Sequence, residues 1–179
     1  IHQASLKLLS ETGLDVLHDD ARALMKKAGA DVREGVIRVR FDPGLINEAI
    51  ATVPSEFKLH ARNPQHSVTF NGDNIVFNMM ASAPNCSDTD RGRRAGNQED
   101  YRNFLRLAQM HNILHVTGGY PVEPVDIHPS VRHLDCIQDY ITLTDKAYCI
   151  YALGEDRVSD AIEMTRIAYG LTSDQMRDQ

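Results

Sequence analysis

The stretch Ile37–Pro64, IRVRFDPGLINEAIATVPSEFKLHARNP, contains a strand, a helix and a second strand, and each boundary has its own signal. Apolar residues alternate with arginines over the first five positions, which predicts a half-buried strand. Asp42 followed by Pro43 predicts a helix cap with proline at the first helical position, and Pro54 stops that helix. Alternation resumes over Phe57–Ala61 and predicts the second strand.

Two further helices are expected before this stretch. The first carries an apolar run from Leu6 and ends at Gly13. The second begins at Asp19 or Asp20 and ends at Gly29, since glycine readily takes the left-handed conformation of a helix end.

Two β-hairpins are expected beyond residue 64. Residues 68–70 and 75–77 would face each other across a turn in which Asn71-Gly72 supplies positive φ angles. The polar, turn-rich residues 81–96 predict a long loop or an exposed hairpin. Its three arginines favour a solvated hairpin over a phosphate site; they are Arg91, Arg93 and Arg94.

From residue 75 the pattern also alternates between strands and helices. Strands are predicted over Ile75–Met79, Ile113–Thr117 and Ala147–Leu153, each followed by a helix. Asn97, with Asp100 three residues later, and Ser130 are the expected caps of the first two helices, and Gly170 closes the third.

Three strand-then-helix units build a parallel sheet, either doubly wound or closed into a barrel. A barrel of this type has eight units and about 250 residues, so the chain is expected to be the opening part of one. The alternative is a complete small α/β protein that takes its further strands from Val36–Ala61.

Several short segments, in a fixed order, carry a family resemblance: TGLDV at 12–16, KAGA at 27–30, VIRV at 36–39, ATVPSEF at 51–57 and HARNP at 60–64. Together they resemble the N-terminal region of the trimethylamine methyltransferase family, and the likeness continues more loosely to about Gly170. The resemblance implies an α/β fold: the N-terminal part of a (β/α)8 TIM-type barrel preceded by a small helical and β domain. Residues 1–66 would form the N-terminal α+β segment, and residues 67–179 the first strand–helix units of an incomplete barrel.

The resemblance also implies an activity, since members of this family move a methyl group from a methylated amine to a corrinoid protein. The cofactor would be a corrinoid (cobalamin) carried by that partner protein. A quaternary ammonium leaves without needing a proton, so a quaternary amine is the expected substrate. Two alternatives stay open: another enzyme on the same barrel, or a non-catalytic α/β module that binds a small molecule or a protein. The oligomeric state is also open, a homo-oligomer included.

The overall composition limits the class of protein and the compartment that are expected. The formal net charge is −6, which argues against a general nucleic-acid binder. Three cysteines without close spacing argue against a disulfide framework, so a reducing, cytoplasmic compartment is expected. No apolar run approaches the roughly 20 residues that span a bilayer. The helical pattern already includes Ile1, so we expect the natural N-terminus to be trimmed, missing or disordered.

Binding residues are expected beyond the C-terminal ends of the strands, where parallel α/β proteins place their sites. A cationic amine suits aromatic faces and carboxylates. The candidate substrate-binding residues are Asn78, Gly118, Gly119, Tyr120, Glu123 and Tyr151, with Asp126 as a further counter-charge. Each also has a structural interpretation: a core position for Tyr120 and Tyr151, a loop cap for Asn78, and solvated loop positions for Glu123 and Asp126.

No catalytic residue is assigned, because the sequence lacks a nucleophile–base pattern, a P-loop and a complete dinucleotide loop. His111 and His115 are four residues apart but straddle a helix end and a strand. His133 and Cys136 could share a helix face as two zinc ligands, but packing is favoured because no third ligand is evident nearby. No metal site is therefore predicted.

Overall fold

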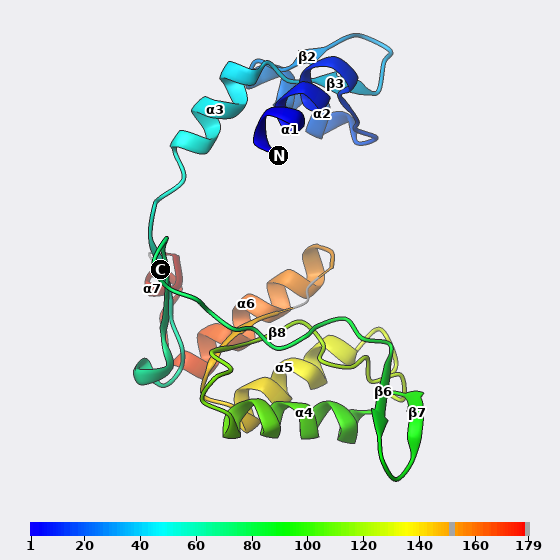
Figure 1. Ribbon diagram of the computed structural model, residues 1–179, viewed down its shortest axis with the longest axis vertical. Helices are drawn as coiled ribbons and strands as arrows, with labels where there is room; N and C mark the ends of the chain where they lie inside the picture. Colours follow the sequence, from blue (N-terminus) through cyan, green and yellow to red (C-terminus); the bar gives the residue numbers. More distant parts are fainter. Residues whose placement is uncertain (151–152, 178–179) are drawn as a thin grey trace. The chain divides into compact units, whose positions relative to one another are not determined.

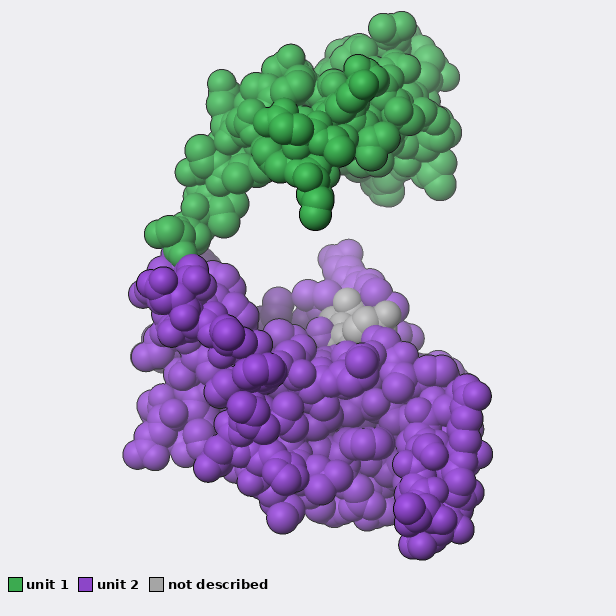
Figure 2. Space-filling model, viewed as in Figure 1, with its two compact units in different colours: residues 1–55 green, residues 56–179 purple. Residues whose placement is uncertain are grey.

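The computed structural model describes residues 1–150 and 153–177. The chain divides into two compact units, Ile1–Ser55 and Glu56–Gln179, drawn in different colours in Figure 2. Figure 1 gives the course of the chain through each unit. No helix of the described part is long and apolar enough to cross a membrane.

Unit 1 is a small α+β body. Its elements are α1 (His2–Lys7), the π-helical turn η1 (Leu8–Thr12), β1 (Leu14–Asp15), α2 (Asp19–Lys27), β2 (Asp31–Val32), β3 (Arg38–Arg40) and α3 (Pro43–Ala51). The three short strands form one antiparallel sheet in the order β1-β3-β2. Val39, at the centre of β3, is fully buried, so the predicted alternating strand is confirmed.

The helix boundaries of unit 1 follow the sequence signals. Asp42 accepts a hydrogen bond from the backbone N–H of Gly44 at 2.7 Å, so the Asp-Pro cap of α3 is confirmed. Gly13 ends η1 at φ +76°, and a side chain there would collide with the carbonyl of Val39. The glycine therefore lets the end of the first helix lie directly against the sheet.

Unit 2 begins with an antiparallel pair, β4 (Phe57–Leu59) and β5 (Val68–Phe70), joined through the short 3-10 helix η2 (Pro64–His66). The predicted pairing of residues 68–70 with 75–77 is therefore wrong. The Phe57 and Phe70 rings stack at 4.8 Å, which favours the earlier partner. The Asn71 side chain accepts hydrogen bonds from the N–H groups of Asp73 and Asn74, and this bend ends β5.

The second hairpin is confirmed, as β6 (Asn85–Asp88) paired with β7 (Gly92–Ala95). It is fastened to the following helix by a buried carboxylate. Asp100 accepts hydrogen bonds from Arg94 at 2.5 Å and Arg91 at 3.2 Å, and Cys86 donates its thiol to the same carboxylate at 3.3 Å. Two of the three arginines therefore neutralise an internal charge.

The rest of unit 2 follows the predicted strand–helix rhythm. Its elements are α4 (Gln98–Met110), β8 (Val116–Gly118), α5 (Arg132–Leu143), β9 (Ala147–Cys149), α6 (Glu155–Tyr169) and α7 (Ser173–Arg177). β8 and β9 pair in parallel, and Asn78 adds a single parallel bridge to Val116. The predicted strand over Ile75–Met79 is thus reduced to one bridge. The described residues show a mixed α/β fold without a closed barrel.

Of the helix-terminal residues predicted for unit 2, Asn97 and Gly170 are confirmed and Ser130 is not. The Asn97 side chain accepts from the N–H of Asp100 at 2.8 Å, as predicted. Ser130 does not cap α5, because its hydroxyl hydrogen-bonds His128 and the helix begins two residues later, after Val131. Gly170 closes α6 in the left-handed conformation, as predicted.

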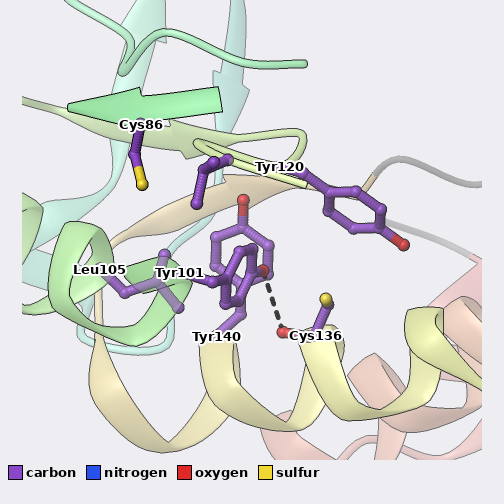
Figure 3. Close-up of a cluster of buried hydrophobic side chains, with 7 residues drawn as sticks. Cys86, Tyr101, Leu105, Tyr120, Cys136 and Tyr140 are labelled. Carbon is purple, nitrogen blue, oxygen red and sulfur yellow. Dashed lines mark hydrogen bonds between the residues drawn. The ribbon is translucent and has the colours of Figure 1, made fainter. Parts of the chain in front are cut away.

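The parallel pair separates two buried clusters. On the side of α4 and α5 the cluster consists of Cys86, Tyr101, Leu105, Tyr120, Val122, Cys136 and Tyr140, most of which appear in Figure 3. On the other side Val116 and Ala147 pack with Ala61, and with residues of the β4–β5 pair around them. The β4–β5 pair therefore covers the lower part of that second face, towards the N-terminal ends of the strands.

Candidate functional site

Strand register brings three small or polar residues together at the C-terminal end of the parallel pair. Asn78 is the partner of Val116, and Gly118 is the partner of Cys149. Side chains alternate along a strand, so Gly118 and Cys149 share the face of Val116 and Ala147. Gly118 and Cys149 form the next layer above that apolar pair, and the side chain of Asn78, level with Val116, reaches Gly118. We call Asn78, Gly118 and Cys149 the strand-end layer.

Asn78 and Gly118 are in direct contact. A Cβ added to Gly118 would lie 2.9 Å from Nδ2 and 3.1 Å from Oδ1 of Asn78. The glycine thus leaves room for the amide beside it, which a larger residue would displace. The two predicted residues come together, and Asn78, which is exposed, can offer both a donor and an acceptor to a ligand.

Gly119 turns the chain away from the strand. Its φ is +59°, its N–H donates to the carbonyl of Cys149 at 2.9 Å, and its carbonyl accepts from the Tyr140 hydroxyl. Both backbone groups of Gly119 are therefore used to hold the end of β8 against β9 and α5. This places Gly119 next to the strand-end layer as the residue that fixes the shape of the turn.

Tyr120 lies on the opposite face, in the cluster between the strands and α4 and α5. It is 7% exposed, and its ring meets that of Tyr101 edge-on at 6.0 Å. Burial raises the pKa of the Tyr120 hydroxyl above its ordinary value. Figure 3 shows the hydroxyl pointing away from Tyr101 and Tyr140. Tyr120 is thus a buried residue that packs the segment after Gly119 against α4 and α5.

Glu123 and Asp126 have structural partners in the loop between β8 and α5. Glu123 forms an ion pair with Arg132 at the start of α5, and its N–H donates to the carbonyl of Ala83. Asp126 accepts from the N–H of Gln98 at 2.9 Å and so caps α4 from outside. Asp126 is exposed and Glu123 is half-buried, and each carboxylate also fastens this loop to a helix.

Tyr151, the remaining candidate, lies outside the described residues. Sequence reasoning also missed a residue, Cys149, two positions before it. The signal was present as strand periodicity, because Cys149 follows the buried Ala147 by two, as Gly118 follows Val116. The thiol was overlooked because the run around it is otherwise apolar.

The histidine pairs singled out in the sequence have other roles. His133 and Cys136 are both buried on α5, and His133 Nε2 lies 2.9 Å from a carboxylate oxygen of Asp160 on α6. His115 Nδ1 accepts from the backbone N–H of Phe77 at 3.0 Å. Within residues 1–150 and 153–177, no three His, Cys, Asp or Glu side chains are grouped as metal ligands.

The strand-end layer thus offers the exposed amide of Asn78 and the exposed thiol of Cys149 at one edge of the sheet. Among the described residues it has no paired nucleophile and base. Such a layer can hold and orient a small molecule. None of the described residues is placed as a base that would activate a nucleophile in it.

The chain matches known proteins over its whole length. Residues 1–179 match the family described as trimethylamine methyltransferase (MTTB). Over 95% of the chain, 36% of residues are identical to a glycine betaine methyltransferase of Desulfitobacterium hafniense (strain Y51), of which 35% is covered. A trimethylamine methyltransferase MttB of D. hafniense (strain DSM 10664 / DCB-2) is 26% identical over 100% of the chain and 36% of its own length. An L-carnitine:corrinoid methyltransferase of Eubacterium limosum is 26% identical over 69% of the chain and 25% of its own length.

The chain therefore spans about a third of the length of the first two of these relatives. The match to the family over every residue, together with the 36% identity, shows that this chain belongs to the trimethylamine methyltransferase family.

Proposed function

We propose that the complete protein moves a methyl group from a quaternary amine of the betaine type to a corrinoid protein, and that this chain is its front portion. The observation that carries the proposal is the 36% identity to a glycine betaine methyltransferase, against 26% to the trimethylamine enzyme. The name of the carnitine relative, whose substrate is also a quaternary ammonium compound with a carboxylate, supports the same class.

The fold supports a barrel in the complete protein. The parallel order of the Asn78 bridge, β8 and β9, each followed by a helix, is the repeat from which a (β/α)8 barrel is built. We propose that residues 67–179 are the first units of that barrel and that residues 1–66 precede it.

The substrate would bind at the strand-end layer. Asn78 would hydrogen-bond a polar group of the amine, Gly118 would keep room for that amide, and Gly119 would fix the turn above it. We propose that Tyr120 and Glu123 support the pocket wall from behind and that Tyr151 completes it. Cys149 joins them as a small, polarizable neighbour of the methyl groups.

The proposed reaction needs no general acid or base from the chain. The C–N bond breaks, its electron pair stays on the nitrogen, and a tertiary amine leaves without a proton. The reduced corrinoid protein is the methyl-accepting substrate and supplies the electron pair for the new bond. Since the corrinoid is carried by that partner, no residue of this chain is assigned to hold it. The chain's share is to bind the cation, exclude water and align it.

A substrate panel tests the proposal. The complete protein is incubated with a reduced corrinoid protein and, one at a time, glycine betaine, carnitine, trimethylamine and dimethylamine, while methyl transfer to cobalt is followed by absorbance. We expect transfer from glycine betaine or carnitine and little from the two unquaternised amines.

Two other outcomes decide against the proposal. Transfer from trimethylamine alone would contradict the betaine assignment while keeping the family chemistry. Tight binding of a betaine without transfer from any amine would favour the non-catalytic binding module.

A further inference from the structure

A cavity opens near the N-terminal ends of β8 and β9, at the opposite end of the parallel pair from the strand-end layer. Its volume is about 330 Å³, and its lining residues are Gln65, His66, Ser67, Val68, Asn112, Leu114, His115 and Lys146. These include two imidazoles and an ammonium and no carboxylate, although the chain carries a net charge of −6.

His115 is held in one orientation and one tautomer. Its Nδ1 accepts a hydrogen bond from the backbone N–H of Phe77 at 3.0 Å, and its ring stacks on that of Phe77 at 6.1 Å. Because Nδ1 is an acceptor, the ring hydrogen must be on Nε2. Nε2 has no hydrogen-bond partner among the described residues, so His115 can donate it to a ligand in the cavity.

His66 is held in the same way by a carboxylate. Its Nδ1 lies 2.7 Å from Oδ1 of Asp145, so Nδ1 carries a hydrogen and Nε2 is the atom left for the cavity. The Asp145 carboxylate has two further donors, since Gln109 donates to Oδ1 at 2.8 Å and Asn63 to Oδ2 at 3.1 Å. Protonation of His66 turns its Nε2 into a second donor.

Lys146 removes the negative charge that this edge would otherwise carry. Its ammonium, buried beside the last turn of α4, donates to the carbonyls of Ala108, His111 and Leu114 at 2.7–2.8 Å. Ala108 lies in the last turn of α4 and His111 is its C-cap, so the ammonium sits at the negative end of the α4 dipole. With those carbonyls and Asp145 occupied by other donors, the two imidazole Nε2 atoms are the groups that we assign to a ligand.

From these contacts we infer that the cavity between η2, β5 and the segment 112–115 is a binding site for a small oxyanion of the phosphate or carboxylate class. His115 Nε2 donates to it, and a protonated His66 adds its Nε2 as a second, charged donor. The site lies at the opposite end of the strands from the strand-end layer, so it is separate from the proposed methyl transfer.

Binding of the oxyanion is expected to strengthen as pH falls from about 8 to 6, the range in which imidazoles gain charge. The titratable groups near His66 are Asp145, Lys146 and His115. Arg62, on the same segment, donates to the carbonyl of Thr144.

The test is titration calorimetry on the complete protein without corrinoid or amine, using inorganic phosphate, sulfate and acetate as separate probes. We expect saturable binding of at least one of them, several-fold tighter at pH 6 than at pH 8. A preference for phosphate or for acetate decides between a phosphate and a carboxylate ligand.

Three variants and one control locate the site. His115→Gln and His66→Gln should each weaken binding at least fivefold, and His18→Gln, on an exposed residue of unit 1, should leave it unchanged. Asn112→Asp adds a carboxylate at an exposed lining position without removing any internal bond, and it should abolish binding. Absence of saturable binding, or equal binding by the wild type and Asn112→Asp, would overturn the inference.

Discussion

Replacing Gly118 with alanine separates the proposed binding role of the strand-end layer from its structural role. The new methyl group would lie 2.9 Å from the amide nitrogen of Asn78, too close for the amide to stay where it is. Asn78 is exposed and its side chain is free to rotate, so the stability change should stay within about 0.5 kcal/mol. If that amide hydrogen-bonds the substrate, losing the bond costs about 1 kcal/mol, which is roughly a fivefold loss of affinity.

Gly119→Ala and Gly72→Ala are the matched controls. Gly119 has a φ of +59°, where alanine costs about 1–2 kcal/mol, so this variant should lose stability by that amount. Gly72 has open space around its Cα, and alanine there should change neither property.

The assay measures the KM for the amine in the complete protein and the urea midpoint of each variant. We expect Gly118→Ala to raise KM about fivefold with an unchanged midpoint. An unchanged KM, or a loss of activity that only tracks a loss of stability, would refute the role given to Asn78 and Gly118.

Three further predictions test the packing around the site. In the native protein iodoacetamide should label Cys149 and spare Cys86 and Cys136, since both are buried and burial raises the pKa of the Cys136 thiol to about 12; peptide mass spectrometry reads this, and a bound betaine should slow the labelling of Cys149. Asp100→Ala should cost about 1–3 kcal/mol in urea unfolding, because Arg94 and Cys86 lose their shared buried acceptor while Arg94 keeps its ion pair with Asp88; a loss below about 0.5 kcal/mol would contradict this. Although burial opposes it, hydrogen bonds from Gln109, Asn63 and His66 hold the pKa of Asp145 at about 2, so its stabilisation should be present above about pH 4 and lost as pH falls towards 2; Asp145→Asn should make acid unfolding less steep in that window.

The sequence predicted best what short-range bonds decide. The caps at Asp42 and Asn97 need only a side chain and an N–H two or three residues away, so their residue types were sufficient. Ser130 has the same residue type, but His128 competes for its hydroxyl, and a pattern of single residues does not rank such competitors.

Pairings between distant segments were harder to predict. The turn signal at Asn71-Gly72 was strong, yet the Phe57–Phe70 contact and the Asn71 bend gave β5 an earlier partner. Tyr120 was expected with equal weight in a pocket or in the core, and burial by α4 and α5 decided for the core. Such outcomes depend on tertiary packing, which local propensity does not contain.

Two of the three residues of the strand-end layer were predicted from the sequence, and the third was missed. Asn78 and Gly118 were found because strand ends of a parallel sheet meet at one edge. Cys149 obeys the same rule, but its register with Gly118 becomes visible only once β8 and β9 are paired.

The central claim is that the methyl group of a quaternary amine passes to a corrinoid protein. The most direct measurement is a single turnover of the complete protein with methyl-labelled glycine betaine and a reduced corrinoid protein, followed by analysis of both products. The account predicts one labelled methyl on cobalt for each N,N-dimethylglycine formed, and no dimethylglycine when the corrinoid protein is omitted. Release of dimethylglycine without the corrinoid protein, or with the label elsewhere than on cobalt, would contradict it.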